Sequence, residues 1–227
     1  MADRQFSFDL GPLRPPDIFY FALRPDAAAA QAMTDVAERC RKRHGLSGRP
    51  YDADRLHLSL SPVVSRYGVG QDDVAAAAEA AARVEADRFP VAFDRICTFG
   101  SRNRRPIVLC CDGGWSALAA FRHSLRGELV KVGLRLGPPN FQPHVTLLWD
   151  KRSVADARLD EPIGWTVDAF VLVRSLTGRS RQIEVGRWPL GATQRRRTRL
   201  PGGSAQSPEP PGCAPPPWPD RARRPYG

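Results

Sequence analysis

Two histidines in this chain each begin the same four-residue pattern of histidine, apolar residue, hydroxyl residue and apolar residue. The pattern reads His-Leu-Ser-Leu at residues 57–60 and His-Val-Thr-Leu at residues 144–147. Successive side chains of a strand point to opposite faces, so each histidine should share a face with the hydroxyl residue two positions later. Two imidazoles and two hydroxyls that face one cleft are equipped for acid–base chemistry on a phosphate ester without a metal. The four residues are His57, Ser59, His144 and Thr146.

The elements around the motifs follow a repeated order. Apolar spacing predicts helices that begin near residue 26, near residue 72 and near residue 115, the last with the strongest amphipathic pattern. Alternating or β-prone runs predict strands at residues 18–23, 56–60, 91–99, 106–111, 143–149, 165–176 and 182–190. The two motifs are separated by about half of residues 17–190, which indicates a duplicated α+β lobe with both motif strands along one groove.

Composition divides the chain into three parts. Residues 1–16 form an N-terminal arm, residues 17–190 the folded domain, and residues 191–227 a Pro/Arg-rich tail that we expect to be disordered. The formal net charge of +10 favours a polyanionic partner such as RNA. The arginines of the tail could add affinity for RNA that does not depend on the RNA sequence. Alternatively, they could only keep the tail solvated.

Cysteine usage and the N-terminus indicate a protein of the cytoplasm. The five cysteines contain no Cys-x-x-Cys pair, so we expect reduced thiols. The sequence shows neither a signal peptide nor an apolar run of the length that a membrane span requires. No acidic or cysteine ligand stands at a suitable spacing to either histidine, so no metal or other cofactor is expected. We expect a monomer.

The motifs resemble those of the 2H phosphoesterase superfamily, specifically the bacterial and archaeal 2′-5′ RNA ligase / RNA 2′,3′-cyclic phosphodiesterase family. The resemblance rests on residues 48–60 and 143–148 and on the strand-like residues 167–175, and it covers about residues 17–190. It implies a bilobal fold with two antiparallel sheets that face a central groove and with helices outside. It also implies hydrolysis of 2′,3′-cyclic phosphate ends to 2′-phosphates, with His57 as the proton donor and His144 as the proton acceptor.

The residues themselves indicate an acid–base pair but do not say which histidine is which. Ser59 and Thr146 can donate hydrogen bonds to phosphoryl oxygens. The same pair of histidines could catalyse the reverse reaction, in which a 2′,3′-cyclic end is joined to a 5′-hydroxyl, as a 2′-5′ RNA ligase does. No glycine-rich phosphate loop is present, so a ligase that depends on a nucleoside triphosphate is not supported.

Two departures from the family pattern leave the substrate open. The family often has phenylalanine five residues after the first histidine and arginine five residues after the second, where this chain has Pro62 and Trp149. Trp149 could stack on a base or pack as a strand-end aromatic. Further candidate contacts to phosphate are the arginines Arg66, Arg102, Arg104 and Arg105.

Three functions therefore compete. The first is an RNA 2′,3′-cyclic phosphodiesterase, and the second is a phosphoesterase of the same chemistry that acts on small cyclic nucleotides. The third is an RNA-binding module without catalysis, against which the two intact imidazoles argue, because binding alone does not require both.

Overall fold

The computed structural model describes residues 17–64, 69–100, 103–111, 113–137 and 141–191. The N-terminal arm and nearly all of the tail therefore lie outside the described residues. The helical elements are α1 (Ala27–His44), the 3-10 turn η1 (Ala53–Arg55), α2 (Gln71–Ala82) and α3 (Ser116–Lys131). The strands are β1 (Ile18–Leu23), β2 (Leu58–Val64), β3 (Phe89–Thr98), β4 (Arg105–Cys110), β5 (Arg135–Leu136), β6 (Val145–Asp150), β7 (Ala157–Val167), β8 (Ala169–Leu176) and β9 (Arg181–Pro189).

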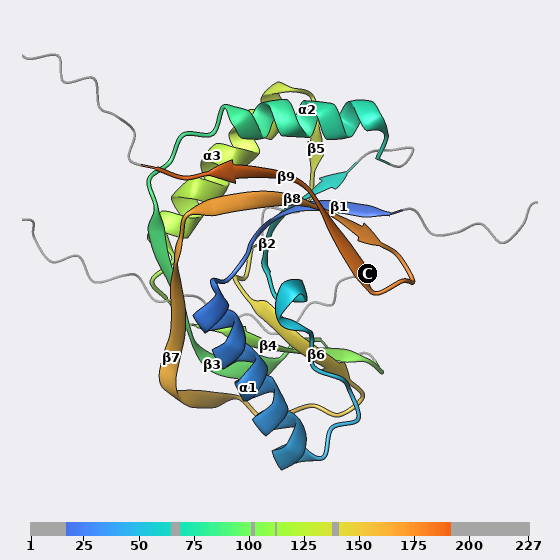
Figure 1. The fold of residues 1–227 in the computed structure, drawn as a ribbon, viewed down its shortest axis with the longest axis vertical. Helices are drawn as coiled ribbons and strands as arrows, with labels where there is room; N and C mark the ends of the chain where they lie inside the picture. The colour runs from blue at the N-terminus through green and yellow to red at the C-terminus, as the bar shows by residue number, and fades with distance from the viewer. Residues whose placement is uncertain (1–16, 65–68, 101–102, 112, 138–140, 192–227) are drawn as a thin grey trace, which may run out of the picture.

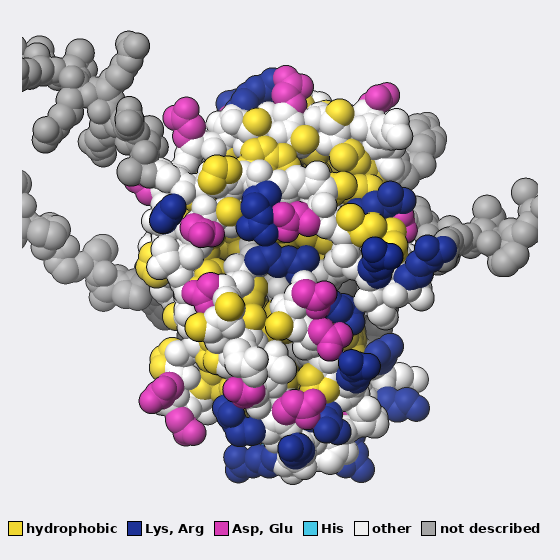
Figure 2. Space-filling model, viewed as in Figure 1, with side chains coloured by type: hydrophobic (Ala, Val, Ile, Leu, Met, Phe, Trp, Pro, Cys, Tyr) yellow, Lys and Arg dark blue, Asp and Glu magenta, His cyan; other side chains and the backbone are white. Residues whose placement is uncertain are grey.

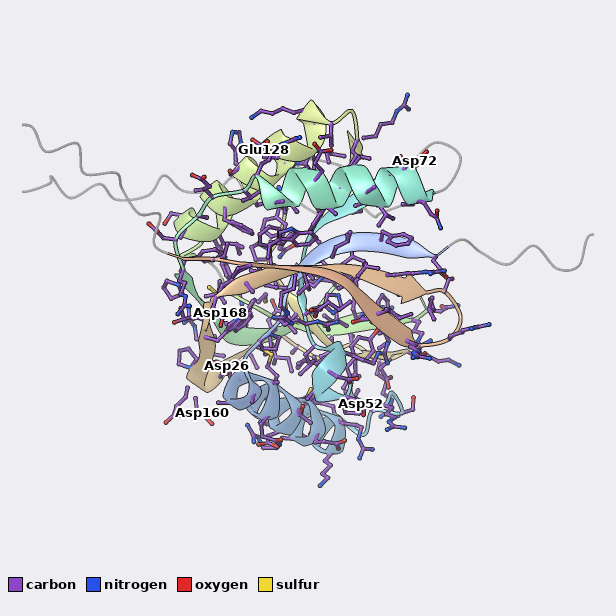
Figure 3. The ribbon with its side chains drawn as sticks, turned by 45° about the horizontal axis from the view of Figure 1, so that its top comes forward. Asp26, Asp52, Asp72, Glu128, Asp160 and Asp168 are labelled. Atoms are coloured by element: carbon purple, nitrogen blue, oxygen red, sulfur yellow. The ribbon has the colours of Figure 1, made fainter. Side chains whose placement is uncertain are left out.

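The boundaries of α1 follow from local chemistry. The side chain of Asp26 accepts a hydrogen bond from the backbone N–H of Ala29 at 2.8 Å, which caps the first turn. Figure 3 places Asp26 and Asp72 at the starts of α1 and α2, where a carboxylate also suits the helix dipole. The helix α1 ends at Gly45, whose left-handed backbone (φ 58°) a glycine adopts at little cost.

The strands among the described residues form one antiparallel sheet, in the order β7-β3-β4-β6-β2-β1-β8-β9, with β5 beside β2. The family resemblance implied a bilobal fold with two sheets that face a central groove, whereas the described strands form one continuous sheet. The two halves are continuous because the motif strands β2 and β6 pair with each other, through the single residue pair Leu58 and Val145. The motifs therefore begin side by side in the middle of one sheet.

The helices lie outside the strands, as the resemblance implied. Figure 1 shows α1 at one end of the molecule and α2 with α3 at the other, with the strands between them. Helix α3 buries Leu118, Phe121, Leu125 and Leu129, which confirms its predicted amphipathic face. On the opposite face of the sheet are two small clusters, one around Val173 in β8 and one around Val108 in β4.

Two strand boundaries differ from the sequence prediction. Strand β2 continues through Pro62, where the sequence predicted that it closes; its pairing with β6 is limited to Leu58, so the missing N–H of proline breaks no bond to that neighbour. The single strand predicted at residues 165–176 is two strands, because β7 ends at Val167 and β8 begins at Ala169.

Basic side chains gather on part of the surface. Figure 2 shows lysine and arginine side chains over the last turn of α1 and near the turn between β8 and β9. The last turn of α1 contains Arg41, Lys42, Arg43 and His44. The cysteines among the described residues, at positions 40, 97, 110 and 111, form no disulfide bond. No described helix is both long and apolar enough to span a bilayer.

Candidate active site

The motif side chains alternate between the two faces of the sheet as the sequence predicted. Leu58 and Leu60 are buried in the main core, whereas Ser59 is exposed. In β6, the core residues Val145 and Leu147 are fully buried, and Thr146 between them is half-buried on the other face. The hydroxyl residues of both motifs therefore lie on the face of the sheet that the helices do not cover.

The two imidazoles are held in the same way. The Nδ1 of His57 is 2.7 Å from the carbonyl oxygen of Arg55, and the Nδ1 of His144 is 2.8 Å from that of Gln142. A carbonyl oxygen can only accept, so in both rings Nδ1 carries the proton and donates it. The neutral tautomer then leaves Nε2 with a lone pair, and the cationic form has a proton at Nε2 to give away. Each imidazole is thus oriented to act as either base or acid.

Burial makes both imidazoles less basic than a free histidine. Burial lowers the pKa of His57 from 6.5 to about 4, although the hydrogen bond to the Arg55 carbonyl raises it. The positive charges of Arg24 and Arg55, and that of His144 when it is protonated, lower the pKa of His57 further. Burial also lowers the pKa of His144. Near neutral pH the free protein therefore keeps both rings uncharged.

This depressed pKa predicts a loss of stability in acid. As the pH falls below 6.5, His57 binds a proton in the unfolded chain, but in the folded chain it binds one only near pH 4. The free energy of unfolding therefore decreases as the pH is lowered through this window. Replacing His57 by glutamine should remove up to roughly 3 kcal/mol of this pH dependence. Urea unfolding at pH 7 and pH 4.5 measures it, with exposed His123 replaced by glutamine as the control. Equal pH dependence in the His57→Gln variant and the wild type would contradict the assignment.

Each histidine also has one aromatic neighbour. The ring centroids of Tyr20 and His57 are 5.1 Å apart, and those of Phe99 and His144 are also 5.1 Å apart. Tyr20 comes from β1 and Phe99 follows β3, so the two contacts come from different parts of the chain. Burial raises the pKa of Tyr20 to about 12, although Arg24 lowers it, so its hydroxyl stays protonated. These rings restrict water around the imidazoles and contribute to their lowered pKa.

Both motif strands contain a bulge at the same position. In β2, Ser59 pairs with Ala22 and Ser61 with Phe21, so the ladder skips Leu60. In β6, the skipped residue is Leu147. The extra residue inverts the alternation, so the fifth position after each histidine returns to the histidine's face. These positions hold Pro62 and Trp149.

The backbone carbonyl at each bulge accepts a hydrogen bond from outside its ladder, from a side chain in one case and from the backbone in the other. The Leu60 oxygen accepts a hydrogen bond from Nε of Arg122 at 2.8 Å, and the Leu147 oxygen accepts one from the backbone N–H of Tyr51, also at 2.8 Å. A bulge leaves a ladder group unpaired, so these bonds satisfy it. The two motif strands thus share the position of the bulge as well as the sequence pattern.

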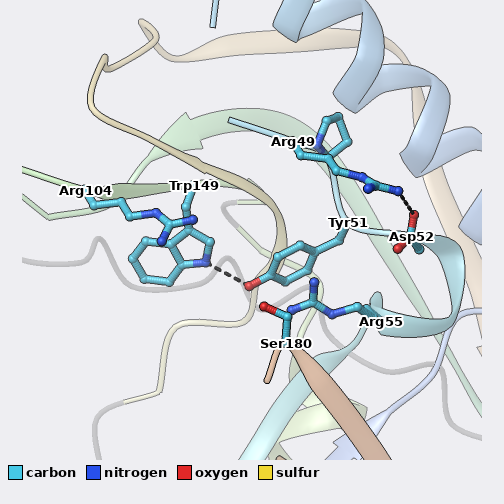
Figure 4. A pocket seen from close by; sticks show the side chains of 8 residues that line it. Arg49, Tyr51, Asp52, Arg55, Arg104, Trp149 and Ser180 are labelled. Carbon is cyan, nitrogen blue, oxygen red and sulfur yellow. Dashed lines mark hydrogen bonds and ion pairs between the residues drawn. The ribbon is translucent and has the colours of Figure 1, made fainter. Parts of the chain in front are cut away.

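A pocket of about 620 Å³ adjoins the motif strands, and Figure 4 shows it from close by. It is lined by Arg49, Pro50, Tyr51, Asp52, Arg55, Arg104, Trp149 and Ser180. The sequence predicted Trp149 and Arg104 as contacts to the substrate, and both line this pocket. The loop before the first motif supplies Tyr51 and Arg55, which the sequence analysis missed because nothing in its pattern marks them.

The other arginine candidates do not join this pocket. Arg105 pairs in register with the buried Asp150, on the face of the sheet opposite to Trp149. Arg66 and Arg102 lie outside the described residues.

A buried carboxylate fixes the loop that forms one wall of the pocket. Asp150 accepts hydrogen bonds from the backbone N–H of Gly48 at 2.6 Å, from that of Arg152 at 2.8 Å and from the Ser47 hydroxyl at 3.1 Å. Burial alone would raise the pKa of Asp150, but these hydrogen bonds outweigh it and hold the pKa below its usual range. The carboxylate therefore stays charged and ties the loop to the end of β6.

Gly48 lets this loop pass directly against the backbone of β6. A Cβ at this position would collide with the carbonyl group of Trp149. We therefore expect Gly48→Ala to lower the free energy of unfolding by about 2–4 kcal/mol and to displace the pocket wall. Urea unfolding measures the loss. Gly127→Ala is the matched control, because Gly127 is exposed in α3 with open space around it and should gain up to about 1 kcal/mol. A Gly48→Ala variant as stable as the wild type would contradict the close approach.

The family follows from a comparison with known protein families. Residues 24–179, which contain both histidine motifs, match the model described as the 2′-5′ RNA ligase superfamily. The chain belongs to the 2′-5′ RNA ligase superfamily. The sequence resemblance to the 2H phosphoesterases is thereby confirmed. A search of curated proteins found no match.

Solved structures share the fold of this 2′-5′ RNA ligase superfamily member. E. coli LigT complexed with 3′-AMP is similar with a TM-score of 0.63 and 23% sequence identity, over 78% of this chain and 99% of that chain. The protein TT0787 of Thermus thermophilus is similar with a TM-score of 0.61 and 17% identity, over 77% of this chain and 99% of that chain. The crystal structure of a phosphoesterase is similar with a TM-score of 0.62 and 23% sequence identity, over 78% of this chain and 99% of that chain.

Proposed function

We propose that this protein hydrolyses RNA 2′,3′-cyclic phosphate ends to 2′-phosphates by acid–base catalysis with His57 and His144. The observation that carries the proposal is that the two imidazoles are held by the same kind of hydrogen bond. Each donates from Nδ1 to a backbone carbonyl, each has Nε2 left for proton transfer, and each stands two residues before a hydroxyl on the same face. The family supports the phosphoesterase chemistry, and the net charge of +10 supports an RNA substrate.

The two histidines and the two motif hydroxyls account for both proton transfers and for the charge on the phosphoryl oxygens. Nε2 of neutral His144 takes a proton from water, whose oxygen attacks phosphorus. The bond from phosphorus to the 3′ oxygen breaks, and Nε2 of protonated His57 gives its proton to that oxygen. Ser59 and Thr146 donate hydrogen bonds to the phosphoryl oxygens, where charge increases in the transition state. The cycle closes when solvent returns His57 to the cation and His144 to the neutral form.

The role of His57 as the acid requires a bound substrate that favours the protonated imidazole. Burial, together with the charges of Arg24 and Arg55, lowers the pKa of His57, so its imidazole is neutral in the free protein near neutral pH. The substrate phosphate carries a negative charge and, when bound, favours the protonated imidazole that the free protein disfavours. Substrate binding and proton uptake at the site are thus linked.

Product analysis tests the proposal. The purified protein is incubated with a cyclic-ended oligonucleotide and with small cyclic nucleotides, in the presence of EDTA. We expect conversion of the oligonucleotide to a 2′-phosphate. Among the described residues, no group of three or more His, Cys, Asp and Glu side chains could hold a metal ion, so EDTA should leave the rate unchanged. A 3′-phosphate product or no turnover of any substrate would contradict the proposal.

A further inference from the structure

The pocket beside the motif strands is separate from the groups assigned to catalysis. None of the four motif side chains lines it, yet its wall includes Arg55, whose carbonyl holds His57, and Trp149, which the bulge returns to the face of His144. Its volume of about 620 Å³ lies in the usual range for ligand pockets, about 300–1,000 Å³. A ligand can therefore occupy the pocket while a phosphate reacts at the histidines.

Charge makes the pocket suitable for an anion. Three arginines line it against one acid, Asp52, which is paired with Arg49 at 3.4 Å at an exposed position. Arg104 forms no ion pair with any described residue. The Nε of Arg55 is buried and has no hydrogen-bond partner in the part of the chain that the structure describes. Because Arg55 lines the pocket, its guanidinium can donate charge-assisted hydrogen bonds to a phosphate there.

Two aromatic rings add a surface for a base. The indole Nε1–H of Trp149 donates to the hydroxyl of Tyr51 at 3.0 Å, and this bond fixes the orientation of both rings (Figure 4). The guanidinium of Arg55 lies over the Tyr51 ring, 4.0 Å from its centroid. The Trp149 ring is half-buried and has no such partner among the described residues, so it can stack on a nucleobase.

We propose that this pocket binds the nucleotide that precedes the cyclic end. Trp149 stacks on its base, and Arg55 and Arg104 bind the phosphate that links it to the terminal nucleotide. The substrate class is then an oligonucleotide of at least two nucleotides, and a mononucleotide cyclic phosphate uses only the histidine site. This inference rests on the proposed function, because it takes the reacting phosphate to lie at the histidines.

Three substrates test the subsite: a 2′,3′-cyclic mononucleotide, its 5′-phosphorylated form, and a cyclic-ended dinucleotide. We expect kcat/KM to be about 10- to 100-fold higher for the dinucleotide than for the mononucleotide, with the 5′-phosphorylated form between them. Equal values for the dinucleotide and the mononucleotide would overturn the subsite. A 5′-phosphorylated mononucleotide that matches the dinucleotide would also overturn it, because the pocket would then bind a phosphate alone.

Substitutions in the pocket test whether the preference for the dinucleotide over the mononucleotide arises there. Trp149→Ala and Arg55→Gln should each reduce the ratio of the dinucleotide to the mononucleotide value of kcat/KM, whereas Trp149→Phe, which keeps a stacking ring, should keep most of it. Arg43→Gln, at an exposed position in the last turn of α1, is the control and should leave the ratio unchanged. A ratio that Trp149→Ala and Arg55→Gln both leave unchanged would overturn the proposal.

A binding measurement separates failure of the subsite from failure of the proposed function. Calorimetric titration with a 3′-phosphorylated dinucleotide and with the corresponding mononucleotide requires no turnover. If the wild type hydrolyses none of the three substrates, the proposed function fails, but tighter binding of the dinucleotide, lost in Trp149→Ala, would still support the pocket. Equal affinity for both ligands would overturn the subsite whatever the activity.

Discussion

Replacing either His57 or His144 by alanine is expected to lower kcat/KM for a cyclic-ended oligonucleotide by at least about 10³-fold. Each imidazole handles one of the two protons of the reaction, and neither Ser59 nor Thr146 can take over that role. The expected loss is similar for both variants and for the double variant, because residues that act as a unit are not additive. Initial rates at several pH values measure the effect.

The control for this pair is His123→Ala, since His123 is exposed on α3. It should keep the wild-type rate, and circular dichroism should show all the variants folded. Removing a half-buried imidazole of lowered pKa should leave the fold intact near neutral pH, because that group is uncharged there. Near wild-type rates in His57→Ala or in His144→Ala would contradict the mechanism.

Removing the motif hydroxyls is expected to give the second largest effect. Ser59→Ala and Thr146→Val should each lower kcat by about 10²-fold, because each removes one donor from the charged phosphoryl oxygens in the transition state. The loss should appear mainly in kcat and less in KM, since charge on these oxygens increases as the reaction proceeds.

Thr34→Val is the matched control for the hydroxyl variants. The Thr34 hydroxyl donates to the Ala30 carbonyl within α1, away from both motifs, so its loss should leave kcat unchanged. An unchanged kcat in both Ser59→Ala and Thr146→Val would show that these hydroxyls do not contact the reacting phosphate.

The alternation of two short strands was enough to predict the shared face of the motif residues. Leu58, Leu60, Val145 and Leu147 are all buried, so their positions in the core place the polar neighbours on the other face. Helix boundaries were equally local, because Asp26 caps the start of α1 and Gly45 its end. Features of this kind depend on neighbours within a few residues, which a sequence shows directly.

The features that the sequence did not show depend on contacts between distant segments. Strict alternation would place Trp149 on the face opposite to His144, five positions earlier, and only the bulge at Leu147 reverses this. Tyr51 joins the site because its N–H binds the carbonyl at that bulge, almost a hundred positions later in the chain. The single sheet likewise follows from one pairing, between Leu58 and Val145, that periodicity cannot reveal.

The central claim is that the two imidazoles act in opposite protonation states, one as acid and one as base. A phosphodiester with a nitrophenolate leaving group tests this most directly, because its departing oxygen needs no proton. The account predicts that His57→Ala recovers most of the wild-type rate on this substrate, whereas His144→Ala remains as impaired as on a cyclic-ended oligonucleotide. Equal impairment of both variants on both substrates would contradict the assignment of separate acid and base roles.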